Sequence, residues 1–154
     1  MTMLELRSRH LFTMTVLLEP AQLDGPTPYG HRRIVIIRGG AFEGERMRGA
    51  LLPGGGDWVL GRADGSLALD VRLTLKTDDG AAILMTYRGY RHGPPEVLAR
   101  LAQGEILDPS LYYFRINPLF ETADERYGWL NNLVAVGIGE RLSDGPRYTV
   151  YEVL

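Results

Sequence analysis

Asp70 and Arg72 are the two residues whose types and spacing most directly suggest chemistry. They stand two positions apart in segment 66–76, where apolar side chains from Leu67 to Leu75 alternate strictly with polar ones. Such alternation is typical of a half-buried antiparallel strand, and it puts both charged groups on one face. An aspartate beside an arginine can move a proton while the arginine holds a carboxylate or an enolate.

The direction in which this polar face points separates two interpretations. If the leucines fill the interior of the protein, Asp70 and Arg72 form an ion pair in solvent, which contributes little stability. If the polar face lines a cavity instead, the leucines point outward and a partner subunit must cover them. The pattern by itself favours the first interpretation.

The segment Pro53-Gly-Gly-Gly-Asp57-Trp58 is a second candidate for a functional site. Consecutive glycines let a backbone come close to a ligand or to another backbone, while Asp57 and Trp58 add a carboxylate and a flat apolar wall. The Gly-Lys-Ser/Thr ending of a phosphate-binding loop is missing. From this segment alone, a tight corner with a hydrogen-bonded aspartate and a core tryptophan is the simpler explanation.

Aromatic, amide and guanidinium groups provide further candidates for binding a substrate. Tyr, Trp and Asn are typical of a mostly apolar pocket with a few placed hydrogen-bond donors. The expected substrate-binding residues are Trp58, Arg88, Tyr113, Arg115, Trp129 and Asn131. Core packing by the aromatic residues and turn capping by the asparagine explain any one of them equally well.

Strand patterns recur along nearly the whole chain. Segment 66–76 ends in Thr77-Asp-Asp-Gly80, whose Asp-Gly pair favours a tight hairpin turn into a second strand over 81–91. Residues 20–30 are expected to form a loop, and the Pro-Glu start and glycine end of 95–103 predict one helix. Further strands are expected over 11–19, 33–40, 58–61, 111–116, 127–141 and 147–153, and residues 41–52, interrupted by two glycines, are expected to form two short strands or one bulged strand.

The expected fold class is therefore mainly all-β. About 8–10 short antiparallel strands with one short helix suggest a closed barrel or a sandwich. A barrel is favoured because closure removes the free edge strands. The 154 residues are long enough to bury a core without disulfides, and residues 1–154 are expected to form one domain.

The composition excludes several classes of function. The chain has no cysteine, which rules out disulfides, thiolate nucleophiles and zinc–thiolate sites. Its three histidines lack ligand spacing, so we expect no metal and no cofactor. A net charge of −2 without a basic cluster argues against nucleic acid as a partner. No segment suits a membrane helix or a signal peptide, so we expect no membrane partner and a cytoplasmic location.

Several segments together resemble a known family. They are Pro-Gly-Gly-Gly-Asp-Trp at 53–58, Leu-Asp-Val-Arg at 69–72, Thr-Asp-Asp-Gly at 77–80, Phe-Glu-Thr at 120–122, Trp-Leu-Asn at 129–131 and Val-Tyr-Glu-Val at 150–153. Their order and spacing resemble the DUF3237 (UPF0311) family of unknown function, from Phe12 to Val153. The resemblance implies a small calycin- or lipocalin-like antiparallel β-barrel and supplies no established reaction.

The resemblance also changes the balance between the two interpretations of the polar face. Asp57, Asp70, Arg72 and Asn131 fall within the family's motif positions. An exposed ion pair gives little reason for that placement. The interpretation in which Asp70 lines the barrel interior therefore gains equal weight, and it implies a homo-oligomer that covers the outward leucines.

The leading hypothesis is a small-molecule enzyme with a cofactor-independent acid–base site in the barrel mouth. Asp70 would be the general acid or base, Arg72 the anchor for an anionic group and Asp57 a second proton carrier or an orienting group. An isomerase, cyclase, lyase or hydrolase of a carbonyl-containing metabolite fits equally well. The alternatives are a non-catalytic carrier of a hydrophobic small molecule, with an apolar lumen, and a structural oligomer with a filled barrel.

Segment 34–37, Ile-Val-Ile-Ile, bears on the oligomeric state. It places apolar side chains on both faces of one strand, whereas a monomeric barrel has one dry face. The helix at 95–103 presents only about two apolar turns as cover. We therefore expect a homo-oligomer, either a two-fold dimer or a tetramer built from one, with strand faces in the contact.

Overall fold

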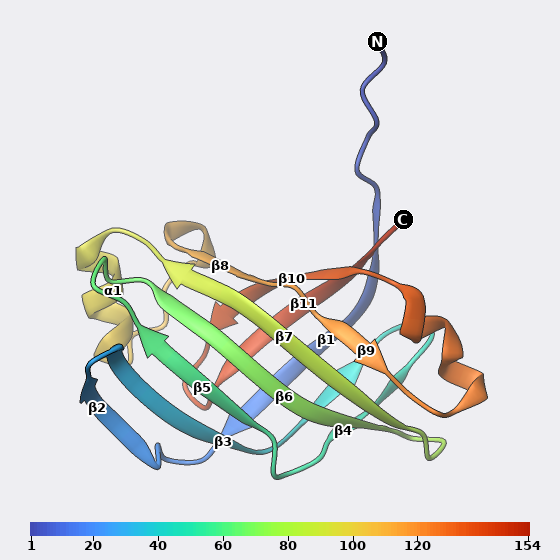
Figure 1. The fold of residues 1–154 in the computed structure, drawn as a ribbon, viewed down its shortest axis with the longest axis horizontal. Helices are drawn as coiled ribbons and strands as arrows, with labels where there is room; N and C mark the ends of the chain where they lie inside the picture. Colours follow the sequence, from blue (N-terminus) through green and yellow to red (C-terminus); the bar gives the residue numbers. More distant parts are fainter.

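Strands make up most of the computed structural model, which describes all of residues 1–154 (Figure 1). The eleven strands are β1 (Ser8–Leu18), β2 (Leu23–Thr27), β3 (Gly30–Glu43), β4 (Arg48–Leu51), β5 (Gly56–Gly61), β6 (Leu67–Thr77), β7 (Ala82–His92), β8 (Tyr113–Ile116), β9 (Leu119–Glu121), β10 (Ala135–Arg141) and β11 (Pro146–Val153). The helical elements are α1 (Pro95–Ala102) and the 3-10 helices η1 (Pro109–Leu111) and η2 (Glu125–Asn132).

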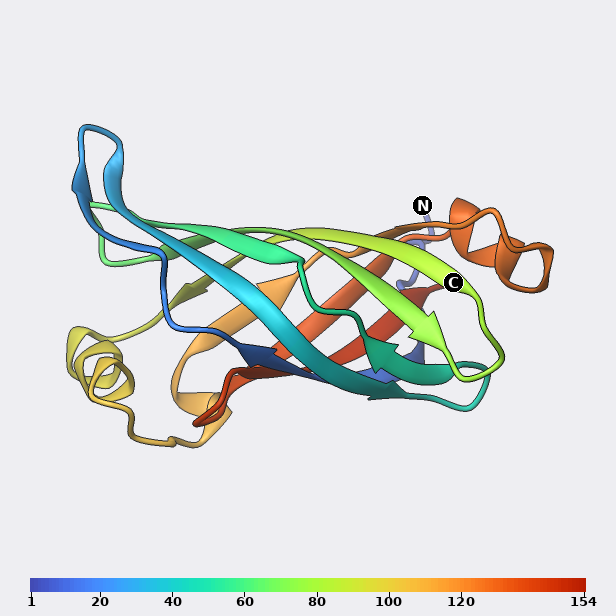
Figure 2. The ribbon, with the colours of Figure 1, turned by 90° about the horizontal axis from the view of Figure 1, so that it is seen from below.

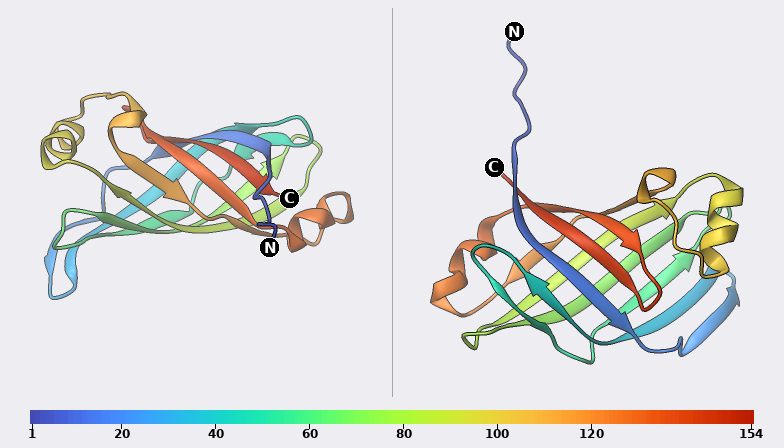
Figure 3. Two further views of the ribbon diagram at one scale, coloured as in Figure 1. Left: turned by 90° about the horizontal axis from the view of Figure 1, so that it is seen from above. Right: turned by 180° about the vertical axis from the view of Figure 1, so that it is seen from behind.

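Eight of these strands close into a barrel. The ring runs β6-β5-β3-β1-β11-β10-β8-β7 and returns to β6, and every pairing in it is antiparallel. Figure 3 shows β1 and β11, the first and last strands of the chain, side by side in this wall. Strands β2, β4 and β9 add to it: β2 pairs with β3, β4 bridges β3 and β6, and β9 pairs with β7. The predicted closed antiparallel barrel is confirmed.

The hairpin of β6 and β7 is the longest uninterrupted pairing in the barrel. It runs from Leu67 opposite Arg91 to Lys76 opposite Ala82, and Gly80 takes a positive φ of 99° in the turn. The apolar face of β6 points inward, where Val71 and Leu73 are each 2% exposed. Asp70 and Arg72 consequently lie on the outer face.

The interpretation in which the polar face of β6 lines the lumen is therefore wrong. Each buried leucine or valine of this face contributes about 2 kcal/mol relative to an exposed position. Turning the strand over would expose that face and would bury Asp70 and Arg72 away from water. The hydrophobic effect thus decides the direction of the strand.

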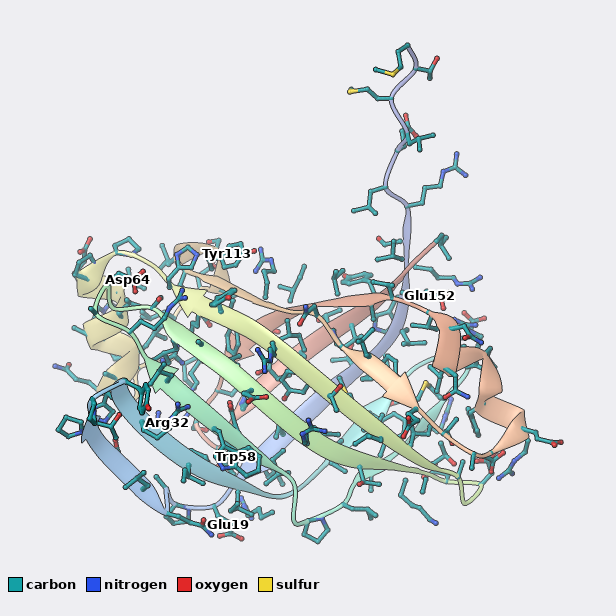
Figure 4. All side chains as sticks on the ribbon, in the orientation of Figure 1. Glu19, Arg32, Trp58, Asp64, Tyr113 and Glu152 are labelled. Carbon is teal, nitrogen blue, oxygen red and sulfur yellow. The ribbon has the colours of Figure 1, made fainter.

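The end of the barrel that carries β4, β9 and η2 is filled with side chains; we call it the closed end. Its packed residues include Leu11, Phe12, Met14, Phe42, Leu75, Ile83, Met85, Phe120 and Leu130. Glu152 also points inward there, is 4% exposed, and accepts hydrogen bonds from Arg9 and Arg46. The Arg46 guanidinium in turn lies 4.2 Å from the centre of the Trp129 ring. Figure 4 shows Glu152 far from α1.

Several segments differ from the strands and loops expected from the sequence. Within the expected loop 20–30, residues Leu23–Thr27 pair with the start of β3, and this hairpin extends from one end of the barrel (Figure 2). Strand β3 continues through Gly39 and Gly40, both with positive φ, where a break was expected. A side chain at Gly40 would lie 2.1 Å from the carbonyl oxygen of Thr15, so the glycine lets β3 bend against β1.

The expected strand 127–141 begins only at Ala135. Residues 125–132 form η2 instead, and the Asp124 side chain accepts a hydrogen bond from the Arg126 backbone N–H at its start. The Asn131 side chain accepts from the Thr122 backbone N–H at 2.8 Å and donates to the Thr122 carbonyl at 3.0 Å. The Asn131 amide thus forms the hydrogen bonds to the Thr122 backbone N–H and carbonyl that a neighbouring strand would otherwise form. For this reason η2 can stand in place of a strand here.

Helix α1 lies beside the turn between β5 and β6, where its Leu98 approaches Gly65 (Figure 1). Its buried residues, Val97 and Leu101, join the core. It therefore does not cover the outer face of β3, on which Ile34 and Ile36 remain partly exposed. None of the helical segments has the length and apolar character needed to cross a lipid bilayer.

Glu152 provides a test of what stabilises the closed end. Replacing it by glutamine (Glu152→Gln) keeps the shape but leaves Arg9 and Arg46 without a carboxylate partner. We expect the free energy of unfolding in urea at pH 7 to fall by about 2–3 kcal/mol. Glu140→Gln, which breaks the more exposed pair with Arg147, should cost less than about 1 kcal/mol. Equal effects would contradict a special role for Glu152.

The outer face of the barrel supports a homo-oligomer, which we propose on this ground. Because the leucines of β6 are buried, they need no partner subunit to cover them. The outer face nevertheless carries Trp58, Val136 and Ile138, each about 40% exposed. We expect a dimer or a tetramer by light scattering at micromolar concentration, with Ile138→Lys lowering the mass. A mass of 17.2 kDa for the unmodified chain would contradict this prediction.

Candidate functional site

A small cavity of about 60 Å³ lies inside the barrel at the end beside α1; we call it the mouth cavity. Its apolar wall consists of Leu18, Val35, Val59, Leu67, Leu69, Phe114 and Pro146. Its polar groups are Arg33, Asp57, Arg91, Arg141 and Tyr148. Each polar residue comes from a different strand (β3, β5, β7, β10 and β11), and each shares the inward face with buried apolar neighbours.

The glycine segment before β5 places Asp57 at this cavity. A side chain at Gly55 would lie 2.5 Å from the carbonyl oxygen of Arg72, so only glycine lets the chain come this close to β6. The Asp57 carboxylate then accepts a hydrogen bond from the Asp70 backbone N–H at 3.1 Å. The β5–β6 pairing is interrupted next to this bond, between Asp57 and Leu60. The carboxylate therefore takes the place of a strand partner.

Asp57 has an unusual pKa for a carboxyl group. Burial raises its pKa from the usual 3.8 to about 6, and the nearby charge of Asp70 adds to this effect. The hydrogen bond from the Asp70 backbone and the charge of Arg33 act in the opposite direction. A carboxyl group that titrates this close to neutral pH can both accept and donate a proton during a reaction.

Two buried tyrosines lie next to Asp57. The rings of Tyr87 and Tyr148 are 5.4 Å apart between centroids, and Phe114 packs 5.3 Å from Tyr148. Burial and the charge of Asp57 both raise the pKa of Tyr148, and the pKa of Tyr87 is raised for the same reasons together with the influence of Tyr148. Both phenols therefore keep their protons near neutral pH, so that their hydroxyl groups remain hydrogen-bond donors.

The guanidinium groups at the cavity are short of partners. The Nε atoms of Arg33 and Arg91 are buried and form no hydrogen bond. Burial and the charge of Arg141 lower the pKa of Arg91, while burial and the charge of Arg33 lower that of Arg141. With three arginines and one aspartate, the cavity carries an excess of positive charge although the whole chain has a net charge of −2.

The structure places the other proposed catalytic residues outside the barrel. Asp70 lies opposite Arg88 in the β6–β7 pairing, and their side chains approach to 3.9 Å. Together with Arg72, they line a shallow groove that also includes Thr86, Asn117 and Leu119.

The proposed substrate-binding residues fall into two groups, neither of which reaches the mouth cavity. Trp58 and Tyr113 are 40% and 45% exposed on the outer wall (Figure 4). Arg88, Tyr113 and Arg115 do come together in an outer groove of about 470 Å³, where Arg115 lies 5.0 Å from the centre of the Tyr113 ring. Trp129 and Asn131 lie in η2 at the closed end, where the latter has the backbone role described above.

Of the residues proposed from the sequence, the structure thus brings only Asp57 to the mouth cavity. Sequence reasoning missed Arg33, Arg91, Arg141 and Tyr148. The signal was the same alternation that identified β6: Arg33 shares a face with Val35 and Ile37, and Arg91 shares one with Tyr87. No three His, Asp or Glu side chains lie close enough together to hold a metal ion.

The fold and the mouth cavity define a closed β-barrel with a small polar site inside one end. Within this class, the family model described as "Protein of unknown function (DUF3237)" matches residues 6–153, so the chain belongs to this family. It is 36% identical over 149 residues to the UPF0311 protein RPA1785 of Rhodopseudomonas palustris, covering 97% of each chain. The crystal structure of RPA1785 has a TM-score of 0.94 over 99% of this chain and 100% of that one.

Two further relatives widen the comparison. The structure of a β-barrel-like protein from Acinetobacter baumannii is 40% identical and has a TM-score of 0.85 over 99% of both chains. The hydroalkoxylation enzyme phnH of Penicillium herquei is 25% identical over 134 residues, which cover 87% of this chain and 74% of that protein. The family therefore has a distant relative that is an enzyme.

The raised pKa of Asp57 predicts that this residue destabilises the protein. In the folded state the group binds its proton up to about pH 6, whereas in the unfolded chain it does so only up to 3.8. Its contribution to stability therefore falls as the pH rises from about 4 to 6 and is constant above. We expect Asp57→Asn to raise the free energy of unfolding by about 2–3 kcal/mol at pH 7.5, with the gain vanishing near pH 4.

Asp78→Asn, at an exposed position in the turn after β6, provides the matched control for this measurement. It should change the free energy of unfolding by less than about 0.5 kcal/mol at either pH. Urea denaturation of both variants between pH 4 and 7.5 provides the data. An Asp57→Asn protein that is less stable than the unmodified chain at pH 7.5 would contradict the prediction.

Proposed function

We propose that the chain is a cofactor-independent acid–base enzyme whose site is the mouth cavity. The observation that carries this proposal is Asp57, a partly buried carboxyl group with a pKa of about 6 beside a cavity lined by guanidinium and phenol groups. The general acid or base is thus assigned to Asp57 in place of Asp70. The substrate class remains a small carbonyl-containing compound.

The proposed chemistry is redox-neutral. The Asp57 carboxylate removes a proton from a carbon next to a carbonyl group. The C–H electron pair forms a C=C bond, and the π electron pair of the carbonyl moves to its oxygen, which becomes an enolate. An arginine of the cavity and the Tyr148 hydroxyl stabilise this negative oxygen. Where the enolate is conjugated with a second C=C bond, return of the proton to the far carbon gives isomerisation, whereas departure of a leaving group from the β-carbon gives elimination.

The distant enzyme relative supports this reaction class. Hydroalkoxylation adds an O–H group across a C=C bond, so that one carbon gains a proton and the other gains the oxygen. It needs a group that delivers a proton to carbon and a group that receives the hydroxyl proton, and it needs no change in oxidation state. A single carboxyl group with a pKa of about 6 can serve in both steps.

The non-catalytic carrier is the weaker alternative. A carrier of hydrophobic molecules is expected to have an apolar lumen without ionisable groups of shifted pKa. Here the apolar part of the interior is filled at the closed end, and the open part holds three arginines and an aspartate. The same open part argues against a barrel that is merely a filled structural unit.

Deuterium exchange tests the proposal on a range of candidate substrates. The chain is incubated in D2O with a library of oxo acids, diketones and hydroxyaryl ketones, and loss of C–H signals is followed by NMR. We expect at least one compound to exchange faster, with Asp57→Asn slowing that exchange about 100-fold or more. The rate should rise as the pH increases through about 6, since the carboxylate is the active form.

Two further variants make this test decisive. Asp78→Asn should exchange at the rate of the unmodified chain. Asp70→Asn should stay within about tenfold of that rate, because its side chain lies on the outer wall and acts on Asp57 only through charge. If Asp70→Asn loses the exchange activity while Asp57→Asn keeps it, the assignment to the mouth cavity is refuted.

A further inference from the structure

Arg91 and Arg141 at the mouth cavity differ in their surroundings from the arginines that the fold pairs with acidic side chains. At the closed end, Arg9 and Arg46 both pair with Glu152, and on the outer surface Arg100, Arg126 and Arg147 each pair with an acidic side chain. Arg91 and Arg141, by contrast, take part in none of the ion pairs of the chain. The mouth cavity therefore contains cations that the fold itself does not neutralise.

The hydrogen-bonding capacity of these groups is also unused. The buried Nε of Arg91 has no acceptor, and its guanidinium lies 5.9 Å from the centre of the Phe114 ring. The Arg33 side chain is 40% exposed; its Nε forms no hydrogen bond and lies 3.9 Å from the carboxylate of the half-exposed Asp24. Arg141 donates to the neighbouring Leu142 carbonyl. Each group retains donors that can serve a ligand.

Such an arrangement is unfavourable for the chain alone. Burial of a cation without a partner costs free energy, and three like charges around one cavity repel each other more strongly there than in water. A planar guanidinium presents paired donors that fit a carboxylate with two parallel hydrogen bonds. An anionic group bound among these arginines would satisfy both the charge and the donors.

We infer that the mouth cavity binds the carboxylate of its substrate through Arg91 and Arg33, with Arg141 adding positive charge. This inference rests on the proposed function, because it names the substrate class of the same site. A cavity of about 60 Å³ accommodates a carboxylate and little more. In this arrangement the remainder of the substrate extends out of the mouth of the barrel. The carbon attached to the substrate carboxylate then lies beside Asp57.

Binding of simple anions tests this inference. The probes are benzoate, its neutral analogue benzamide and the tetrahedral anion phenyl phosphate, each titrated by NMR against the intact chain. We expect benzoate to bind at least tenfold more tightly than either of the other two. Equal binding of benzamide would refute an anion site, and equal or tighter binding of phenyl phosphate would refute the assignment to a carboxylate.

Variants locate the binding. Arg91→Met should weaken benzoate binding tenfold or more without lowering the midpoint of urea unfolding, because it removes a buried cation that has no partner. Arg91→Lys, which keeps the charge but loses the planar fork, should weaken binding by a smaller factor. Arg38→Met, on the outward face of the same strand as Arg33, is the matched control and should leave benzoate affinity unchanged. Retention of full affinity in Arg91→Met would overturn the inference.

Asp57→Asn separates this inference from the proposed function. It removes a negative charge from the cavity, so benzoate should bind with equal or greater affinity while deuterium exchange is lost. If benzoate binding depends on Arg91 but no deuterium exchange depends on Asp57, the carboxylate site is supported and the proposed enzyme activity is refuted. Exchange on neutral ketones without benzoate binding would refute the carboxylate site and leave the enzyme standing.

Discussion

The inward burial of the apolar face of β6 is the constraint on which the rest of the barrel depends. Once Leu69, Val71 and Leu73 point inward, the antiparallel pairing with β5 and β7 determines which side chains of those strands share the interior. Asp57 and Arg91 are then inside, and Asp70 and Arg88 are outside. Burial of the apolar side chains of β6 thus determines which charged side chains face the interior.

Much of the fold could be predicted because its signals are local. The alternation in 66–76 and the turn at Asp79-Gly80 predict the β6–β7 hairpin correctly, since both depend only on neighbouring residues. The same alternation separates two faces of a strand and by itself favours burial of the leucines, which the structure confirms. Which strands share that interior depends on closure of the barrel, which brings together residues from opposite ends of the chain. The η2 segment escaped prediction because the Asn131–Thr122 contact replaces a strand pairing through a side chain.

The candidate site was predictable only in part, for the same reason. Asp57 stands next to a glycine run, which is a visible local signal. Arg33, Arg91 and Arg141 each resemble an ordinary surface arginine when considered alone. The alternation places Arg33 and Arg91 on the same strand face as apolar residues, but it does not show that this face lines a cavity. Only the ring order, in which β3, β7 and β10 face one interior, brings them to one cavity. Charges that converge from distant strands are therefore difficult to recognise from a single sequence.

The separation between the closed end and the mouth cavity has an evolutionary consequence. The packed residues of the closed end and the Glu152 cluster supply stability far from the mouth cavity. Substitutions around the mouth can therefore accumulate without unfolding the protein, provided that the far end is kept. Such a division of labour makes a small barrel adaptable, so that homologous chains can diverge in their chemistry while sharing almost the same backbone.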